Sequence, residues 1–233
     1  MKIKVITRLV LIVVFTIGFY SCSGDNKKTT KLEEETTCPK TISYVGKTYN
    51  TVLIGDQCWL RENLDIGTMI DSLADATDNG IIEKYCYGND PSNCETYGGL
   101  YAWDEAMQYS TTPGAQGICP DNWHIPTLAE FDTLIKSVND DGNALKEVNQ
   151  GLGEGRGTDT SGFSALMAGR RDYSRDYYGY FYYLGYRTYF WSSSEHGTDP
   201  DRASTMSLFT SDSIIYFTSS YKYNGFSVRC VKD

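Results

Sequence analysis

The stretch from residue 170 to residue 189 concentrates the side chains that are best suited to molecular recognition. It holds eight tyrosines and four arginines, which are Tyr173, Tyr177, Tyr178, Tyr180, Tyr182, Tyr183, Tyr186, Tyr189, Arg170, Arg171, Arg175 and Arg187. A tyrosine ring gives a large, rigid contact area with a polar tip at little cost in side-chain entropy, so binding loops use it often. An exposed ring also stacks on the C–H face of a sugar. The candidate ligand-binding residues of this Tyr- and Arg-rich loop are Arg171, Tyr173, Tyr177, Tyr178, Tyr180 and Arg187.

The same stretch has a structural alternative. Aromatic residues also occur on both faces of a β-strand when one face packs in the core and the other is covered. The run Tyr180-Phe181-Tyr182-Tyr183 fits that pattern. Residues 211–224 form a second polar stretch, which repeats Ser, Thr, Tyr, Lys and Asn. That composition suits adaptable hydrogen bonding, but an exposed edge hairpin is the stronger interpretation of it.

No motif for a metal, a cofactor or catalysis is evident. The two histidines are His124 and His196, and no cysteine pair has Cys-x-x-Cys spacing, so a zinc site is not expected. The acidic segments 71–75 and 199–201 lack the alternating ligands of a calcium loop. No Gly-x-Ser-x-Gly elbow, Walker loop or histidine-based triad occurs either. We therefore expect no metal, no cofactor and no enzymatic activity.

The N-terminus has the layout of a secretory signal that ends at Cys22. Three basic residues precede an apolar run at residues 9–20, which is shorter than the roughly 20 residues of a membrane-spanning helix. Phe19-Tyr20-Ser21-Cys22 resembles a bacterial lipobox, at which the signal is cut off before the cysteine and acyl chains such as palmitate are attached to it. We predict a lipoprotein signal peptide at residues 1–21 and lipidation of Cys22. The alternative is a plain signal peptide with an incidental cysteine.

Residues 22–40 are expected to form the lipidated cysteine and a flexible tether, and residues 41–233 a single folded domain. The segment 23–37 has almost no apolar residues, so it cannot bury enough surface to fold. The chain has 22 Gly and 19 Tyr, and its short segments punctuated by Gly, Asn and Asp predict many short strands with structured loops. Its formal net charge of −9 becomes more negative once the basic signal peptide is removed, and so acidic a surface repels nucleic acid.

Six further cysteines in an exported chain predict disulfide bonds, and they are Cys38, Cys58, Cys86, Cys94, Cys119 and Cys230. Six cysteines allow fifteen pairings, between which spacing gives only hints. The turn-rich residues 87–93 let the chain double back, which favours Cys86–Cys94. A bridge from Cys119 to Cys230 would close a loop of about 110 residues and constrain the unfolded chain by roughly 4 to 5 kcal/mol. Cys38–Cys58 is then the remaining pair.

The periodicity of the domain predicts two helices followed by a strand-rich half. Residues 42–54 alternate apolar and polar side chains, which is typical of a β-hairpin. Residues 101–109 fit a short amphipathic helix, and Thr127 followed by Glu130 has the capping-box spacing that begins a second helix. Strand-like runs follow at residues 163–167, 181–184, 188–192, 205–209, 214–218 and 226–231. This order of elements predicts an α+β fold.

Several short motifs occur together along the domain. They are Ile54-Gly55-Asp56-Gln57-Cys58-Trp59, Glu62-Asn63-Leu64, Tyr97-Gly98-Gly99-Leu100-Tyr101-Ala102-Trp103, Gly117-Ile118-Cys119-Pro120, Trp123-His124-Ile125-Pro126-Thr127, Gly162-Phe163-Ser164-Ala165-Leu166, Phe190-Trp191-Ser192-Ser193-Ser194-Glu195 and Gly225-Phe226-Ser227-Val228-Arg229-Cys230-Val231. In this order they resemble the Fibrobacter succinogenes major paralogous domain family, which occurs in lipoproteins and other exported bacterial proteins. The resemblance covers about residues 41 to 233.

The resemblance implies a C-type lectin-like fold of the α+β class. In that fold two helices flank a small twisted antiparallel β core, long irregular loops carry binding, and disulfides staple the domain. The resemblance also favours the Cys119–Cys230 pair, because lectin-like domains tie the C-terminal strand to the region of the second helix. We interpret the four tryptophans and His124 as scaffold. Calcium-dependent sugar binding is not implied, since the Glu-Pro-Asn or Gln-Pro-Asp loop and the Trp-Asn-Asp strand of such lectins do not occur here.

We therefore expect a non-catalytic, lipid-anchored binding module of the bacterial outer membrane, facing the cell surface or the periplasm. Its Tyr- and Arg-rich loop would recognise a glycan or a cell-surface protein. One alternative is a structural or accessory envelope lipoprotein with no exchangeable ligand. The other is an enzyme related to the formylglycine-generating oxidases of the lectin-like superfamily, which we disfavour because those enzymes use a pair of free reactive cysteines.

Overall fold

The computed structural model describes residues 38–173 and 179–233. Residues Thr37–Asp233 form one compact unit. Three predicted functional residues, Cys22, Tyr177 and Tyr178, lie outside the described residues, as do the predicted signal peptide and most of the predicted tether. No helix among the described residues is long and apolar enough to cross a bilayer.

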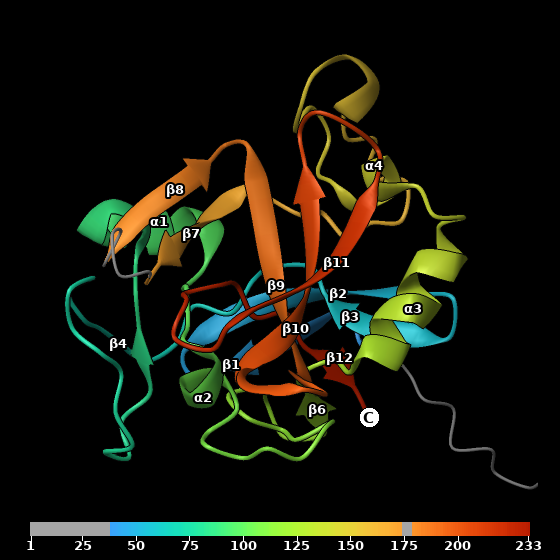
Figure 1. Ribbon diagram of the computed structural model, residues 1–233. Coiled ribbons are helices and arrows are strands. Elements are labelled where there is room, and N and C mark those ends of the chain that lie inside the picture. Colours follow the sequence, from blue (N-terminus) through green and yellow to red (C-terminus); the bar gives the residue numbers. More distant parts are fainter. Residues whose placement is uncertain (1–37, 174–178) are drawn as a thin grey trace, which may run out of the picture. The chain divides into compact units, whose positions relative to one another are not determined.

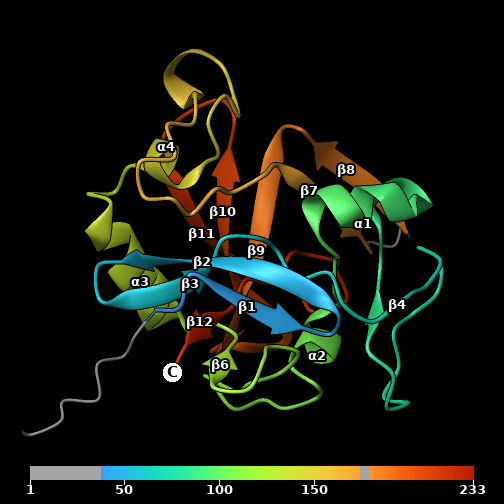
Figure 2. The same ribbon diagram turned by 180° about the vertical axis from the view of Figure 1, so that it is seen from behind.

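The N-terminal hairpin belongs to a five-stranded sheet with the strand order β1-β2-β3-β12-β6, in which each pairing is antiparallel. The strands are β1 Thr41–Tyr44, β2 Lys47–Ile54, β3 Gln57–Leu60, β6 Trp123–His124 and β12 Val231–Lys232. Between β1 and β2, Val45 and Gly46 have φ angles of 45° and 74°, which is the left-handed geometry of a tight hairpin turn. The hairpin predicted over residues 42–54 is confirmed (Figure 2).

A second five-stranded sheet holds the Tyr- and Arg-rich stretch. Its order is β11-β10-β9-β7-β8, with β7 and β9 parallel and the other pairs antiparallel (Figure 1). The strands are β7 Ala168–Asp172, β8 Tyr180–Leu184, β9 Arg187–His196, β10 Asp199–Phe209 and β11 Ile215–Tyr221. β11 lies at the free edge of this sheet, so the edge-hairpin interpretation of residues 211–224 is confirmed.

Short elements connect the two sheets. The α-helices are α1 Pro91–Tyr97, α2 Trp103–Ala106, α3 Leu128–Ser137 and α4 Gly142–Leu145. The 3-10 helices are η1 Tyr87–Asn89 and η2 Gly153–Gly155, and a small parallel pair is formed by β4 Thr68–Met69 and β5 Glu83–Lys84. α3 begins with the predicted capping box, in which the Thr127 side chain accepts a hydrogen bond from the Glu130 N–H and the Glu130 side chain accepts one from Thr127.

The prediction of an α+β, C-type lectin-like fold with two helices flanking a small β core is wrong. The described residues are mostly β, with two curled five-stranded sheets and only four short α-helices. The helix expected over residues 101–109 is the single turn α2, because Gln108 and Tyr109 take left-handed φ angles of 49° and 59° that no helix accommodates. Residues 163–167 are not a strand either, since the strand begins at Ala168 and Ser164 has a φ of 54°.

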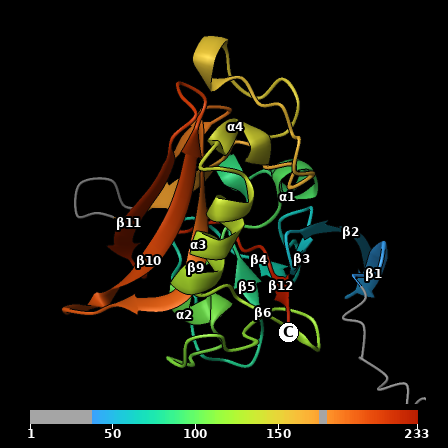
Figure 3. The ribbon, with the colours of Figure 1, turned by 90° about the vertical axis from the view of Figure 1, so that its right-hand side faces the viewer.

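The core lies between the two sheets, which Figure 3 shows on either side of α3 and α4. One buried cluster joins Leu60 of β3 to Trp191 of β9, and a second joins Trp59 of β3 to Met206 of β10. All four tryptophans are buried, which agrees with their interpretation as scaffold; they are Trp59, Trp103, Trp123 and Trp191. The indole N–H groups of Trp103 and Trp191 donate to backbone carbonyls at 2.8 Å.

Three disulfides close the domain. They are Cys38–Cys58, Cys86–Cys94 and Cys119–Cys230, with sequence separations of 20, 8 and 111 residues. These are the three pairs that spacing and the family resemblance favoured. The longest of them ties the segment before β6 to the segment before β12, so it joins positions that are far apart in the chain.

Candidate functional site

Arg171 is fully buried and organises the site from beneath. Its Nε donates to the Ser72 carbonyl at 2.8 Å and its Nη1 to the Tyr223 carbonyl at 2.9 Å. Its guanidinium also lies 4.1 Å from the centre of the Tyr85 ring and 5.0 Å from that of Tyr173. A side chain with no exposed surface cannot touch a ligand, so Arg171 positions its neighbours instead of serving as the contact residue that we predicted.

Tyr173 follows β7 and faces the loop after β11. Its N–H donates to Asn224 Oδ1 at 3.0 Å, and its hydroxyl donates to Asp75 Oδ2 at 3.1 Å. Its ring lies 4.9 Å from the ring of Tyr223, which in turn stacks on Tyr221 at 5.0 Å. Tyr173 after β7, Tyr221 at the end of β11 and Tyr223 in the following turn therefore form a continuous row of aromatic rings.

Tyr180 and Arg187 lie elsewhere on the second sheet. Tyr180, on the edge strand β8, is 61% exposed. Arg187, at the start of β9, stacks its guanidinium on Tyr183 at 4.3 Å and on Phe209 at 4.4 Å. Neither residue lines the cleft beside Tyr173. Of the candidate ligand-binding residues in the described part of the chain, the structure brings together Arg171 and Tyr173 but not Tyr180 and Arg187.

A cleft of about 180 Å³ opens beside Tyr173 and Tyr223. We call it the tyrosine cleft and define it by Asp75, Asp104, Glu105, Tyr109, Tyr173 and Tyr223. The rings of Tyr109 and Tyr223 are each 38% exposed, whereas Tyr85 closes the floor with only 1% of its surface exposed. The cleft thus combines accessible aromatic faces with carboxylates.

Glu105 holds the Tyr109 ring in place. Its Oε2 accepts a hydrogen bond from the Tyr109 hydroxyl at 2.9 Å, and its Oε1 accepts one from the Glu83 N–H at 3.1 Å. Desolvation raises the pKa of this buried carboxyl, and the hydrogen bonds from Glu83 and Tyr109 offset part of that effect. Tyr109 lies three residues after the end of α2 and has a left-handed φ of 59°.

Asp104 is the least satisfied carboxylate of the tyrosine cleft. Desolvation raises its pKa, the positive charge of Lys222 lowers it partly, and no hydrogen bond contributes to the shift. The Lys222 ammonium itself forms an ion pair with Glu195 and lies 4.3 Å from the centre of the Trp103 ring. Asp104 therefore lines the cleft, and the cation beside it, Lys222, is already paired with Glu195.

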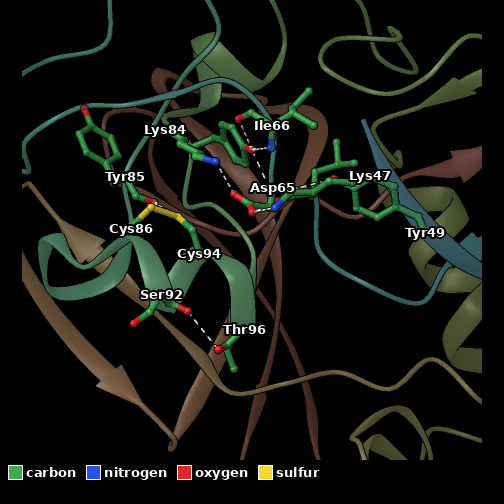
Figure 4. A network of polar contacts seen from close by, with 12 residues as sticks. Lys47, Tyr49, Asp65, Ile66, Lys84, Tyr85, Cys86, Ser92, Cys94 and Thr96 are labelled. Atoms are coloured by element: carbon green, nitrogen blue, oxygen red, sulfur yellow. Dashed lines mark hydrogen bonds and ion pairs between the residues drawn. A yellow bond between two sulfur atoms is a disulfide. The ribbon is translucent and has the colours of Figure 1, made fainter. Parts of the chain in front are cut away.

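A second, polar cleft of about 360 Å³ lies between β2 and α1. Figure 4 shows the network at its wall, where the Asp65 carboxylate forms ion pairs with both Lys47 and Lys84. Desolvation lowers the pKa of both lysines, and for Lys47 the nearby charge of Lys84 lowers it further. The Cys86–Cys94 disulfide fixes α1 beside this network.

Buried Arg229 forms the base of the polar cleft. It donates to Asn63 Oδ1 at 2.7 Å and 3.2 Å, and also to the carbonyl of Phe163, on whose ring it lies at 4.3 Å. Burial lowers its pKa. Because these charged groups already pair within the domain, the polar cleft is explained as a structural network.

Sequence patterns pointed to only part of the tyrosine cleft. Tyr173 was a candidate, Asp75 belongs to the acidic segment 71–75, and Tyr223 belongs to the polar stretch 211–224. Asp104, Glu105 and Tyr109 were missed as site residues, because a regular helix over 101–109 would have placed them on a helix surface. No group of three or more His, Cys, Asp or Glu side chains suited to a metal occurs in residues 38–173 and 179–233.

Comparison with known proteins gives one match. The family model described as Fibrobacter succinogenes major domain matches residues 52–232, which include both sheets except for β1 and the first residues of β2. Neither the curated proteins nor the solved structures gave a match. Since the matched region covers most of the chain, the protein belongs to the Fibrobacter succinogenes major domain family.

Proposed function

We propose that this protein is a non-catalytic binding module of the bacterial cell envelope that recognises a glycan through the tyrosine cleft. The observation that carries the proposal is the convergence of Tyr109, Tyr173 and Tyr223, from three separate segments, beside carboxylates. Aromatic faces stack on the apolar face of a pyranose, while carboxylates and tyrosine hydroxyls accept hydrogen bonds from its hydroxyl groups. The volume of about 180 Å³ suits one sugar unit of a longer chain.

The anchor in this proposal is a lipid on Cys22, which follows the apolar signal. The segment 23–37 then serves as a flexible tether that holds the domain away from the outer membrane, on its surface or periplasmic side. The six cysteines of the domain form disulfides, which supports a binding role over that of an oxidase with two free cysteines.

A structural role toward a protein partner is the second candidate, and the edge strand β11 favours it. Residues 213–221 contain no charged residue and no proline, which are the features that usually protect an exposed sheet edge. Such an edge accepts an additional strand from a partner chain. In this case the domain would be an accessory envelope component and the tyrosine cleft would have no exchangeable ligand.

A glycan screen distinguishes the two candidates. The full-length protein, purified in detergent, is tested against immobilised glycans and polysaccharides with and without calcium. The proposal predicts calcium-independent binding that the double variant Tyr173→Ser/Tyr223→Ser weakens by at least about tenfold, since each stacking contact of an aromatic ring contributes on the order of 1 kcal/mol. If the folded protein binds none of the glycans, the accessory role is favoured. Crosslinking in the native envelope would then identify the partner.

A further inference from the structure

We infer, on the basis of the proposed function, that the tyrosine cleft selects a glycan with a free, protonated amino group. The chemistry of the cleft walls supports this choice over a neutral or an acidic sugar. Three carboxylates line the cleft, from Asp75, Asp104 and Glu105, and within residues 38–173 and 179–233 Lys222 is the one cation that lines it.

The two cations beside the cleft in the described part of the chain, Lys222 and Arg171, already have partners. The Lys222 ammonium is paired with Glu195 and stacked on the Trp103 ring. The Arg171 guanidinium is fully buried and donates to the carbonyls of Ser72, Ala74 and Tyr223. Neither cation is therefore available to a ligand carboxylate or phosphate, so among the described residues an acidic sugar would meet the Asp104 carboxylate without a free cation beside it.

Asp104 is the carboxylate of the cleft that can still take a donor. Glu105 accepts hydrogen bonds on both oxygens, and Asp75 accepts one from the Tyr173 hydroxyl and pairs with Arg171 at 3.9 Å. The Asp104 carboxyl is half-buried, and no hydrogen bond is among the causes of its pKa shift. The neighbouring Lys222 ammonium forms an ion pair with Glu195. Asp75, at the rim, is 55% exposed in its side chain. A charged amine would supply the donors that the half-buried Asp104 carboxylate lacks, and such charge-assisted hydrogen bonds are about twice as strong as neutral ones.

The tyrosine rings favour the same ligand. A cation near an aromatic face is attracted by the negative charge density of the ring, and groups of aromatic rings with carboxylates recognise substituted ammonium ions. The rings of Tyr109 and Tyr223 are accessible for such contacts. A sugar also uses the remaining groups of the cleft, because its hydroxyls pair with Asp75 and the tyrosine hydroxyls while its C–H face stacks. A lysine side chain offers one ammonium and a flexible stem, so it would leave most of these groups unused.

The test compares two ligands that differ only in acetylation. The dissociation constants of a glucosamine tetramer and of an N-acetylglucosamine tetramer are measured by titration calorimetry with the full-length protein in detergent. We expect the glucosamine tetramer to bind at least about tenfold more tightly, because a single charge-assisted hydrogen bond of this kind accounts for that ratio. The preference should diminish with added salt.

Variants separate a specific site from general attraction to an acidic protein. Asp104→Asn keeps the shape of the side chain but removes its charge, so the ratio of the two dissociation constants should fall close to one. Asp132→Asn removes an exposed carboxylate on α3, which is paired with Lys136, and should leave the ratio unchanged. Tyr173→Ser/Tyr223→Ser keeps the net charge, so it should lose binding of both tetramers.

The outcomes are distinguishable. Equal binding of the two tetramers, lost in the double tyrosine variant, would overturn the preference for an amine while the proposed function stands. Binding of a lysine-rich peptide in place of either tetramer would overturn both. A preference for glucosamine that persists in Asp104→Asn or in the double tyrosine variant would show that the positively charged tetramer is attracted to acidic residues outside the cleft. That result would also overturn the inference.

Discussion

At the scale of single residues, His124 shows how two carboxylates hold the ends of separate elements together. Its Nε2 lies 2.7 Å from Glu130 Oε1 and its Nδ1 lies 2.6 Å from Asp233 Oδ1. Desolvation lowers the pKa of His124, but the hydrogen bonds to Glu130 and Asp233 raise it more, so the net pKa lies above the ordinary value of 6.5. The imidazolium donates to both carboxylates, whereas a neutral ring has only one N–H to donate.

We predict that His124→Gln destabilises the protein more at about pH 5.5 than at about pH 8.5. Because the pKa is raised on folding, the stabilisation by His124 is complete below the unfolded pKa of about 6.5 and is lost as the pH rises through the folded pKa. Thermal unfolding of both proteins across this range measures the difference in Tm. The control is His196→Gln. The His196 ring contacts only the Thr198 hydroxyl, at 3.4 Å, among the hydrogen-bond partners of the described residues. A Tm difference that stays constant with pH would contradict the role of the imidazolium.

At the scale of elements, local sequence patterns predicted a helix or strand correctly where residues at its ends mark where it begins. The capping box at Thr127 and Glu130 fixed the start of α3, and the alternation over residues 42–54 fixed the hairpin. The segment after α2 shows the limit. Its apolar spacing suits a helix, but the chain turns at Gln108 and Tyr109, and the Ala106 carbonyl accepts a hydrogen bond from the Ile118 N–H at 2.9 Å. That contact joins distant residues, so no local pattern reveals it.

We predict that Thr127→Ala lowers the free energy of unfolding by about 1 kcal/mol, since it removes the acceptor for the Glu130 N–H. Thr133→Ala, on the exposed face of the same helix, removes a hydroxyl that donates to the Ala129 carbonyl and should cost less than about 0.5 kcal/mol. Denaturant unfolding of the full-length protein measures both values. Equal effects of the two substitutions would show that the cap does not determine the stability of α3.

At the scale of the whole domain, the disulfides join segments whose contacts are far apart in sequence. Cys119–Cys230 closes a separation of 111 residues and ties the C-terminal strand into the first sheet, whereas Cys86–Cys94 closes a separation of 8. All four of these cysteines are buried, so the two bridges have similar surroundings. The length of the closed loop is therefore the main difference between them.

We predict that the double variant Cys119→Ser/Cys230→Ser loses about 4 to 5 kcal/mol of stability, and Cys86→Ser/Cys94→Ser about 2 to 3 kcal/mol, from the entropy of loop closure. Denaturant unfolding of the oxidised wild-type protein and of both variants gives these values. The reverse order of the two losses would show that local packing around α1, and not the loop length, dominates the effect of the bridges.

Nonlocal pairing also explains what the sequence did not predict. Tertiary packing determines the parallel contact between β7 and β9 and the position of β12 in the first sheet. The family resemblance implied helices that flank a small β core, whereas the structure has two curled sheets. The tyrosine cleft draws Asp75, Asp104 and Tyr223 from distant positions, so no spacing rule identifies it. Arg171 looked like a binding residue because its type is common at interfaces, yet its buried position makes it the organiser of that cleft.

The most direct test of recognition through the tyrosine cleft compares two tyrosines, Tyr223 after β11 and Tyr180 on β8. The dissociation constant for the tightest-binding glycan of the screen is measured for the wild-type protein, for Tyr223→Ser and for Tyr180→Ser. Tyr223 lines the tyrosine cleft, whereas Tyr180 is more exposed and lies outside it. We expect at least about tenfold weaker binding for Tyr223→Ser and no change for Tyr180→Ser. The opposite pattern, or an equal loss in both variants, would contradict recognition through the tyrosine cleft.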